Sequence, residues 1–244
     1  MRILFAVFLC FTMTFCFAQK KEVEITYKKT ILIDFDRETK PTNNFSKNEA
    51  LKLLKKLNLE FKNKTFKLWF NDTISCFKEL KRMDLENKTD IISILNNVGG
   101  LTEGVFFTHK NSKQLIQQKS FDAKKYLIYS NTDSLQWNMT NESKQIDGYT
   151  AYKATTIRQR VTRSGLNNET ITAWYTPEIP TSFGPAGFNN LPGLILQLQI
   201  GKLSLYASKI EFNKEIDIFS LEPKKGKKIS KEDFIKLELE QIEN

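Results

Sequence analysis

Apolar and polar positions alternate most clearly in residues 194–200, LILQLQI. Alternation with a period of two is typical of a β-strand that buries one face, and it places Ile195 on the opposite face from the leucines. The Gly-Lys pair at 201–202 fits a two-residue type II′ turn, because glycine occupies the first central position. That turn fixes the register of the returning strand and sets Leu198 opposite Leu205.

Much of the remaining chain is also predicted to form β-strands. β-Branched and aromatic residues gather in short runs separated by turn residues at fairly even intervals, which is typical of an all-β meander. The runs that we expect to be strands are 22–35, 59–70, 73–80, 104–109, 113–118, 124–130, 135–139, 146–161 and 168–176.

Two segments have helical periodicity instead. Ser46 and Glu49 form a capping box ahead of a leucine stripe, which predicts a helix over 47–57. Ser230 and Asp233 mark the start of a second helix at the end of the chain. The polar stretch 81–103 is expected to be an excursion from the sheet, with a helical turn at 90–97.

The first eighteen residues have the pattern of an export signal. Arg2 precedes an apolar run that is shorter than the roughly 20 residues of a membrane-spanning helix. Cys16 and Ala18 place small residues at the positions that signal peptidase requires, so cleavage is expected between Ala18 and Gln19. No later segment is apolar enough over sufficient length to cross a membrane. We therefore predict signal peptide 1–18 and one β-rich domain, 19–244, in the periplasm or associated with the cell envelope.

Cysteine content and charge narrow the picture further. Cleavage removes two of the three cysteines and leaves Cys76, which we expect to be a small buried hydrophobic residue. The net charge of +9 is spread along the chain among acidic residues. Its densest basic run, KKGKK at 224–228, has no interleaved aromatic residues, so nucleic acid is not the expected partner.

The sequence contains no recognised catalytic motif. His109 is the one histidine, which makes a zinc site or a histidine-dependent triad poorly supported, and no phosphate-binding loop or dinucleotide fingerprint occurs. We expect no metal, no cofactor and no enzymatic activity. Glu178, held between two prolines, is the best candidate for a general acid, but a residue that caps a turn or pairs with a lysine is the favoured interpretation.

The loop at 177–190 is the most unusual segment of the chain. It holds three prolines and two glycines between the aromatic run TAWYT and the leucine-rich strand. Its aromatic residues should pack it against the domain, either as a lid over an apolar cavity or as a plug that closes the core. The residues that define the loop and the start of the strand are Pro177, Glu178, Pro180, Gly184, Pro185, Asn190, Pro192 and Gly193.

Three segments together resemble the GLPGLI family of exported proteins from Gram-negative bacteria. They are AWYTPEIPTSFGPAGFNNLPGLILQL at 173–198, KQIDGYTAYKATT at 144–156 and LWFNDTISCF at 68–77. Asn190 replaces the first glycine of the hexapeptide, and asparagine is the next-best residue at positive φ. Ala151 stands where the family commonly has a cysteine. The family has no established activity.

The resemblance implies a fold similar to that of periplasmic lipoprotein carriers. We therefore expect a mainly β (α+β) domain, a curved antiparallel sheet or half-barrel with two short helices. The favoured function is non-enzymatic binding of an acyl chain, a lipopeptide or an apolar segment, with a lipid or cell-envelope component as partner. The ligand would be lined or enclosed by Trp174, Tyr175, Phe188, Leu194, Leu196 and Leu198.

Two other functions stay open. A carbohydrate-active enzyme or accessory module would use Glu178 and the loop aromatics. An interaction domain would have a filled core and no small ligand. The sequence leaves the oligomeric state open.

Overall fold

A computed structural model describes residues 22–32, 47–80, 102–162 and 164–243 of the chain. The predicted signal peptide, the capping residue Ser46 and the expected helical turn at 90–97 lie outside these residues. The elements are β1 (Glu22–Ile31), α1 (Lys47–Asn63), β2 (Thr65–Phe70), β3 (Ile74–Leu80), β4 (Val105–His109), β5 (Gln114–Phe121), β6 (Lys124–Asn131), η2 (Thr132–Ser134), β7 (Asn138–Ile146), β8 (Tyr149–Thr162), β9 (Gly165–Thr176), η3 (Pro185–Gly187), β10 (Leu194–Ile200), β11 (Leu203–Lys214), η4 (Ile218–Leu221), β12 (Lys227–Ser230) and α3 (Lys231–Glu243).

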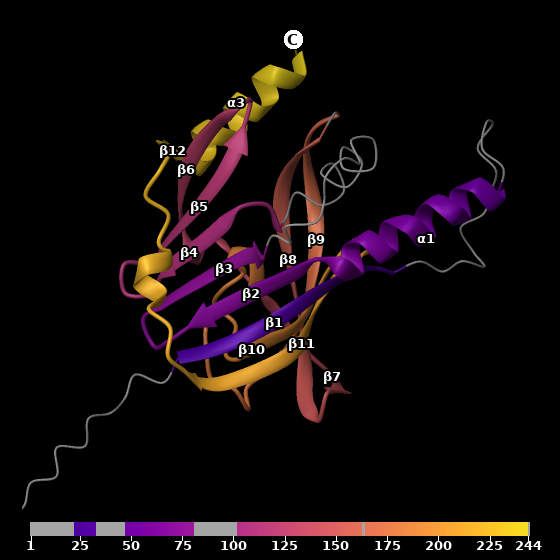
Figure 1. Ribbon diagram of the computed structural model, residues 1–244, viewed down its shortest axis with the longest axis vertical. Helices are drawn as coiled ribbons and strands as arrows, with labels where there is room; N and C mark the ends of the chain where they lie inside the picture. The colour runs from indigo at the N-terminus through magenta and orange to yellow at the C-terminus, as the bar shows by residue number, and fades with distance from the viewer. Residues whose placement is uncertain (1–21, 33–46, 81–101, 163, 244) are drawn as a thin grey trace, which may run out of the picture.

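The strands form one strongly curved sheet (Figure 1). Its order is β12-β6-β5-β4-β3-β2-β1-β11-β10-β9-β8-β7. Neighbours are antiparallel except for β12 and β6, which pair in parallel. The predicted fold class, a mainly β curved sheet with two helices, is confirmed. Among the described residues, no helix has the length and apolar character needed to cross a membrane.

Several predicted boundaries differ from the structure. Residues 59–63, expected in a strand, continue α1 to Asn63. The side chain of Phe61 explains this extension, because it is buried and lies 4.6 Å from the ammonium of Lys29. Residues 135–137, also expected in a strand, connect η2 to β7, which begins only at Asn138. α3 begins as predicted, with Ser230 Oγ accepting a hydrogen bond from the backbone N–H of Asp233 at 3.1 Å.

The hairpin of β10 and β11 has the predicted register, with Leu198 opposite Leu205. A β-bulge between Ile195 and Gln197 interrupts the pairing of β10 with β9. Ile195, expected on the face opposite the leucines, is instead buried in the same core. The bulge accounts for this difference, because an extra residue breaks the alternation of faces.

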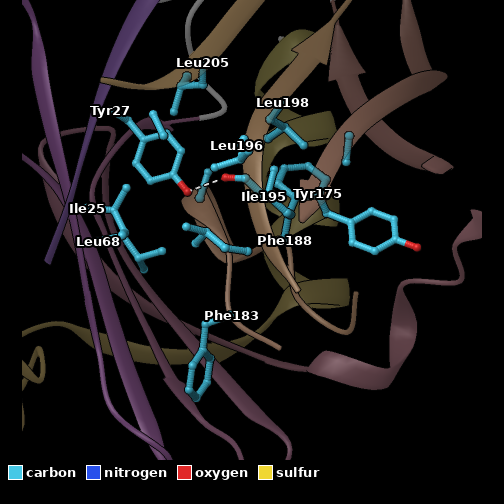
Figure 2. Packing of buried hydrophobic residues seen from close by; sticks show 14 of the residues in the cluster. Ile25, Tyr27, Leu68, Tyr175, Phe183, Phe188, Ile195, Leu196, Leu198 and Leu205 are labelled. Carbon is cyan, nitrogen blue, oxygen red and sulfur yellow. Dashed lines mark hydrogen bonds between the residues drawn. The ribbon is translucent and has the colours of Figure 1, made fainter. Parts of the chain in front are cut away.

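The concave face of the sheet carries the main core (Figure 2). Strand register places Ile25, Leu68, Phe77 and Phe106 side by side on successive strands. Tyr27 lies in the same core, fully buried, and its hydroxyl donates a 2.6 Å hydrogen bond to the carbonyl of Ile195. This bond connects β1 to the bulge of β10 across the intervening strand β11.

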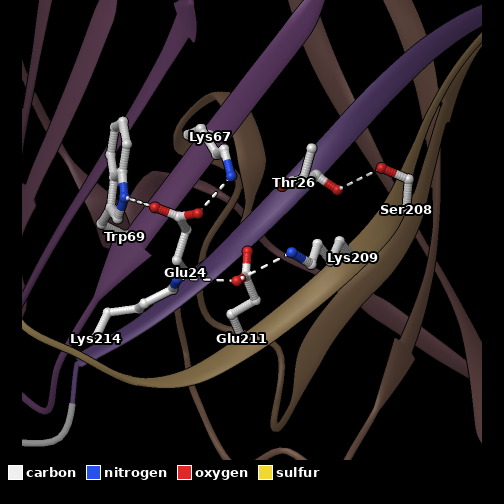
Figure 3. A network of polar contacts seen from close by, with 8 residues as sticks. All are labelled: Glu24, Thr26, Lys67, Trp69, Ser208, Lys209, Glu211 and Lys214. Carbon is white, nitrogen blue, oxygen red and sulfur yellow. Dashed lines mark hydrogen bonds and ion pairs between the residues drawn. The ribbon is translucent and has the colours of Figure 1, made fainter.

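The convex face is divided into an apolar and a polar part. Over β3 to β6, a second core of Cys76 and its apolar neighbours is covered by Ile218 of η4. Over β1, β2 and β11, Figure 3 shows polar contacts in place of a core. Glu24 accepts hydrogen bonds from Lys67 and from Trp69 Nε1. Hydrogen bonds from Lys214 and Lys209 lower the pKa of Glu211 to about 2.

Replacing Tyr27 with phenylalanine tests the connection between β1 and β10. The substitution removes the buried donor to the Ile195 carbonyl while leaving the ring in place. We expect the free energy of unfolding to fall by about 1–3 kcal/mol, the cost of leaving a buried acceptor without its donor. Chemical denaturation measures the change. The matched control is Tyr152→Phe, since this hydroxyl lies on a more exposed side chain, and equal losses in both variants would contradict the prediction.

The thiol of Cys76 should be unreactive in the folded protein. Its side chain is fully buried, and burial raises its pKa to about 12, whereas the thiolate is the reactive form. In a protein of residues 19–244, Cys76 is the single cysteine. A disulfide reagent such as dithionitrobenzoate should therefore label one thiol in denaturant and none in buffer over the same period. Immediate labelling in buffer would contradict the burial of this side chain.

Candidate functional site

The structure brings most of the predicted ligand-binding residues together, but inside the packed core. Leu194, Leu196 and Leu198 are each at most 1 % exposed. Tyr175 lies at the margin of the same cluster (Figure 2), with its hydroxyl 3.5 Å from the sulfur of Met139. Trp174 is half-buried, and the ammonium of Lys144 lies 4.1 Å from its ring centre.

The segment 177–193 packs against the concave side of the sheet. Phe183 packs against Phe70, and Phe188 packs against Trp137, in both cases with ring centres 6.2 Å apart. The indole N–H of Trp137 also donates a 2.8 Å hydrogen bond to the carbonyl of Asn189. The expectation that aromatic residues hold this segment against the domain is therefore confirmed.

Its backbone approaches neighbouring strands too closely for larger residues. A Cβ added at Gly193 would lie 2.1 Å from the carbonyl oxygen of Thr176. At Gly187, where φ is +76°, a Cβ would lie 2.8 Å from a methyl carbon of Leu115. Asn190 has a φ of 73°, as expected for the residue that replaces the first glycine of the hexapeptide, and its side-chain amide donates to the Thr132 carbonyl at 2.8 Å.

One region of the concave side is left open. A cavity of about 310 Å³ lies where the β4–β6 end of the sheet faces β8 and α3. Its apolar wall includes Phe106, Leu115, Leu135 and Phe188. Phe188 is thus the member of the predicted ligand-binding set that lines this cavity.

The opposite wall carries charge. Arg158 and Arg160 of β8 both reach Glu169 of β9, with nitrogen–oxygen distances of 3.1 and 3.7 Å. Lys119, which also lines the cavity, forms ion pairs with Glu238 at 2.9 Å and, more loosely, with a second glutamate, Glu103, at 3.7 Å. The site therefore combines an apolar wall with a predominantly ion-paired one.

Lys231 adds a further cation to this wall. It is the first residue of α3 and lines the cavity. Within the part of the chain that the structure describes, its ammonium forms no hydrogen bond or ion pair. Burial, and secondly the nearby positive charge of Arg158, lower its pKa.

Arg158, Arg160 and Lys231 are site residues that were not predicted from the sequence. A signal was present in the β8 sequence, because Ala154, Arg158 and Arg160 are separated by even numbers of residues and so share one face of a strand. Ala154 is fully buried, so the arginines continue a core-facing row. Lys231 could not be found in this way, since its position depends on how α3 meets the sheet.

The candidate acid–base residues lie elsewhere. Glu178 is exposed, and its carboxylate accepts a 2.8 Å hydrogen bond from the backbone N–H of Thr150. His109 Nε2 lies 3.1 Å from Glu222 Oε1. Among the described residues, no group of three or more His, Cys, Asp or Glu side chains could hold a metal ion.

Substitution of Gly187 tests the fit of the loop against the cavity wall. Gly187→Ala must adopt positive φ and also displace Leu115, so we expect a loss of about 2–5 kcal/mol in the free energy of unfolding, from backbone strain plus overpacking. The control Gly201→Ala also has positive φ but meets nothing within 4 Å. It should lose only about 1–2 kcal/mol in the same denaturation experiment. Equal losses would show that the loop is not tightly packed at Gly187.

Comparison with solved structures shows a shared fold. The chain is similar to PNGF-II in crystals of space group C2, with a TM-score of 0.54 and 18% identity over 91% of this chain and 33% of that one. The P21 form gives a TM-score of 0.52 and 17% identity over 91% and 34%. The chain thus spans about a third of the length of PNGF-II. The Mycobacterium tuberculosis lipoprotein LppX overlaps with a TM-score of 0.26 and 9% identity over 81% and 88% of the two chains.

Part of the chain matches a known family model. No curated protein matches the chain. Residues 158–197 match a family model described as "Protein of unknown function (Porph_ging)". The matched segment runs from Arg158 in the cavity wall, through β9 and the loop, to Gln197 in β10, and it includes NLPGLI at 190–195. This match confirms the resemblance to the GLPGLI-like Porph_ging family over residues 158–197, and the function of that family is unknown.

Proposed function

We propose that this protein is a non-enzymatic binding protein that holds the apolar part of an amphiphilic molecule, such as an acyl chain or a lipopeptide, in the cavity beside Phe188. The observation that carries the proposal is the two-sided cavity itself. Small-molecule sites are commonly concave and mainly apolar, with a few placed polar groups. The volume of about 310 Å³ is at the lower end of the usual range for such sites.

The proposal moves the ligand away from the leucine face of β10. Leu196 and its neighbours pack in the core together with residues of the loop, so their role would be to hold the loop in place. The loop would in turn supply one wall of the cavity through Gly187 and Phe188. Its predicted roles as lid and plug are then combined, since the same segment closes the core and borders the site.

Binding is proposed in preference to catalysis because the charged groups around the cavity are mostly paired with one another. Glu103 and Glu238, the carboxylates in the described cavity wall, both contact Lys119. The carbohydrate alternative depends on Glu178, which is engaged with the backbone of Thr150. We further propose that residues 1–18 direct export and that the ligand is a cell-envelope component.

The alternative with a filled core and no ligand is supported by a separate observation. The leucine face of β10 and the loop leave the main core closely packed. In that case the cavity would be a solvent-filled recess, and the protein would act through its surface.

Blocking the cavity distinguishes these functions. The protein is exported in a bacterial host, purified without detergent and examined by native mass spectrometry before and after addition of octyl phosphate. We expect a bound small-molecule mass or uptake of the probe, and at least a roughly tenfold reduction in Leu135→Trp, because the larger ring fills the apolar wall. The control Leu59→Trp makes the same exchange at an exposed position of α1, outside the cavity.

Each result of this experiment supports a different function or binding site. Loss of the bound mass in Leu135→Trp alone would support the cavity as the site. Retention of the mass in Leu135→Trp would show that the ligand binds elsewhere. No bound mass and no uptake in the unsubstituted protein would favour the filled-core alternative. Unfolding midpoints of both variants, measured in parallel, identify any loss that results from misfolding.

A further inference from the structure

The polar wall of the cavity contains an arginine whose donors are only partly used. Arg158 Nη2 donates to Glu169 Oε2 at 3.1 Å. Its Nε is buried and has no hydrogen-bond partner among the described residues. An arginine carries five N–H donors, and a buried donor without an acceptor is unfavourable. Arg158 also lines the cavity, so a ligand acceptor there would meet a guanidinium whose donors Glu169 satisfies only in part.

A second cation next to Arg158 has no ion-pair partner in the part of the chain that the structure describes. Lys231 lies close enough to Arg158 for the two positive charges to affect one another, and it forms no ion pair with any described residue. Two carboxylates attract these cations electrostatically without forming an ion pair with them. Glu238 acts on Arg158, and Glu232 acts on Lys231. Glu169, however, is shared between Arg158 and Arg160. Among the described residues that line the cavity itself, four are basic, Lys119, Arg158, Arg160 and Lys231, and two are acidic, Glu103 and Glu238.

We infer that the ligand of this cavity has an anionic polar end, a phosphate, sulfate or carboxylate, which binds between the guanidinium of Arg158 and the ammonium of Lys231, two residues that line the cavity. This inference rests on the proposed amphiphile-binding function and specifies the class of amphiphile. The apolar end of the same molecule lies along Phe106 and Leu115 on the opposite wall.

An anion suits these groups better than a neutral polar end does. Hydrogen bonds from a cation to an ionised oxygen are shorter and roughly twice as strong as neutral ones. The cavity also removes much of the water that would otherwise screen the two cations from one another, so their repulsion is reduced when an anion lies between them. Phosphate and sulfate groups have enough oxygens to accept from Arg158 and Lys231 together.

Titration calorimetry with matched probes tests the inference. The probes are octyl phosphate, 1-octanol and inorganic phosphate, each added to the protein purified after export. Octyl phosphate should bind about tenfold or more tightly than 1-octanol, given the usual strength of hydrogen bonds to charged groups. Its affinity should fall as salt is added, whereas that of 1-octanol should change little.

Lys231→Met is the informative variant, because Lys231 has no ion pair with a described residue that its removal would break. We expect it to weaken octyl phosphate binding about tenfold and to leave 1-octanol binding within about twofold. Lys228→Met is the matched control, since it removes the same charge from an exposed position of β12. A weaker effect of Lys231→Met than of Lys228→Met would overturn the inference.

The remaining outcomes distinguish this inference from the proposed function. Equal affinity for octyl phosphate and 1-octanol would overturn the anionic end and leave the amphiphile site standing. Absence of binding by both octyl probes would overturn the proposed function itself. If inorganic phosphate binds as tightly as octyl phosphate, the octyl chain contributes nothing to binding. That result would indicate a site for a free anion and would overturn the proposal of an amphiphilic ligand. If Lys231→Met does not fold, the salt dependence in the unsubstituted protein still decides.

Discussion

The curvature of the sheet is the constraint on which the arrangement of the site depends. Its clearest sign is the hydrogen bond from the Tyr27 hydroxyl to the Ile195 carbonyl on the concave side. Tyr27 belongs to β1 and Ile195 to β10, with β11 between them. A flat sheet would not bring a side chain of one strand to a backbone group two strands away. The β-bulge beside Ile195 supplies the local bend that makes this approach possible.

Curvature of this kind creates a hollow that apolar side chains alone do not fill. The segment 177–193 enters it, and the glycines at 184, 187 and 193 let its backbone approach where a Cβ would collide. The leucine face of β10 consequently supports the loop, and the space that remains is displaced toward β8 and α3. The candidate site therefore lies beside the part of the concave side that the loop covers. The apolar face of β10, which was expected to hold a ligand, is part of the core.

The same geometry accounts for the mixed character of the cavity. The inward row of β8 is apolar or small where the loop covers it and becomes cationic at Arg158 and Arg160 beyond the loop. α3 then brings Lys231 to the same place. Most of these charges are paired, which limits the cost of partial burial. The Nε of Arg158 and the ammonium of Lys231 stand apart from that pairing within the described residues.

The sequence by itself determined the features that depend on neighbouring residues. The turn at 201–202 set Leu198 opposite Leu205, Ser230 marked the start of α3, and Asn190 took the positive φ of the glycine it replaces. The mainly β fold class and the burial of Cys76 followed from periodicity and residue type. Only the tertiary structure decided the bulge at Ile195, the filling of the leucine face and the meeting of Lys231 with Arg158. Hydrogen bonds within a turn or cap act over a few residues, whereas those contacts result from curvature accumulated over many strands and from the path of a loop across the whole sheet.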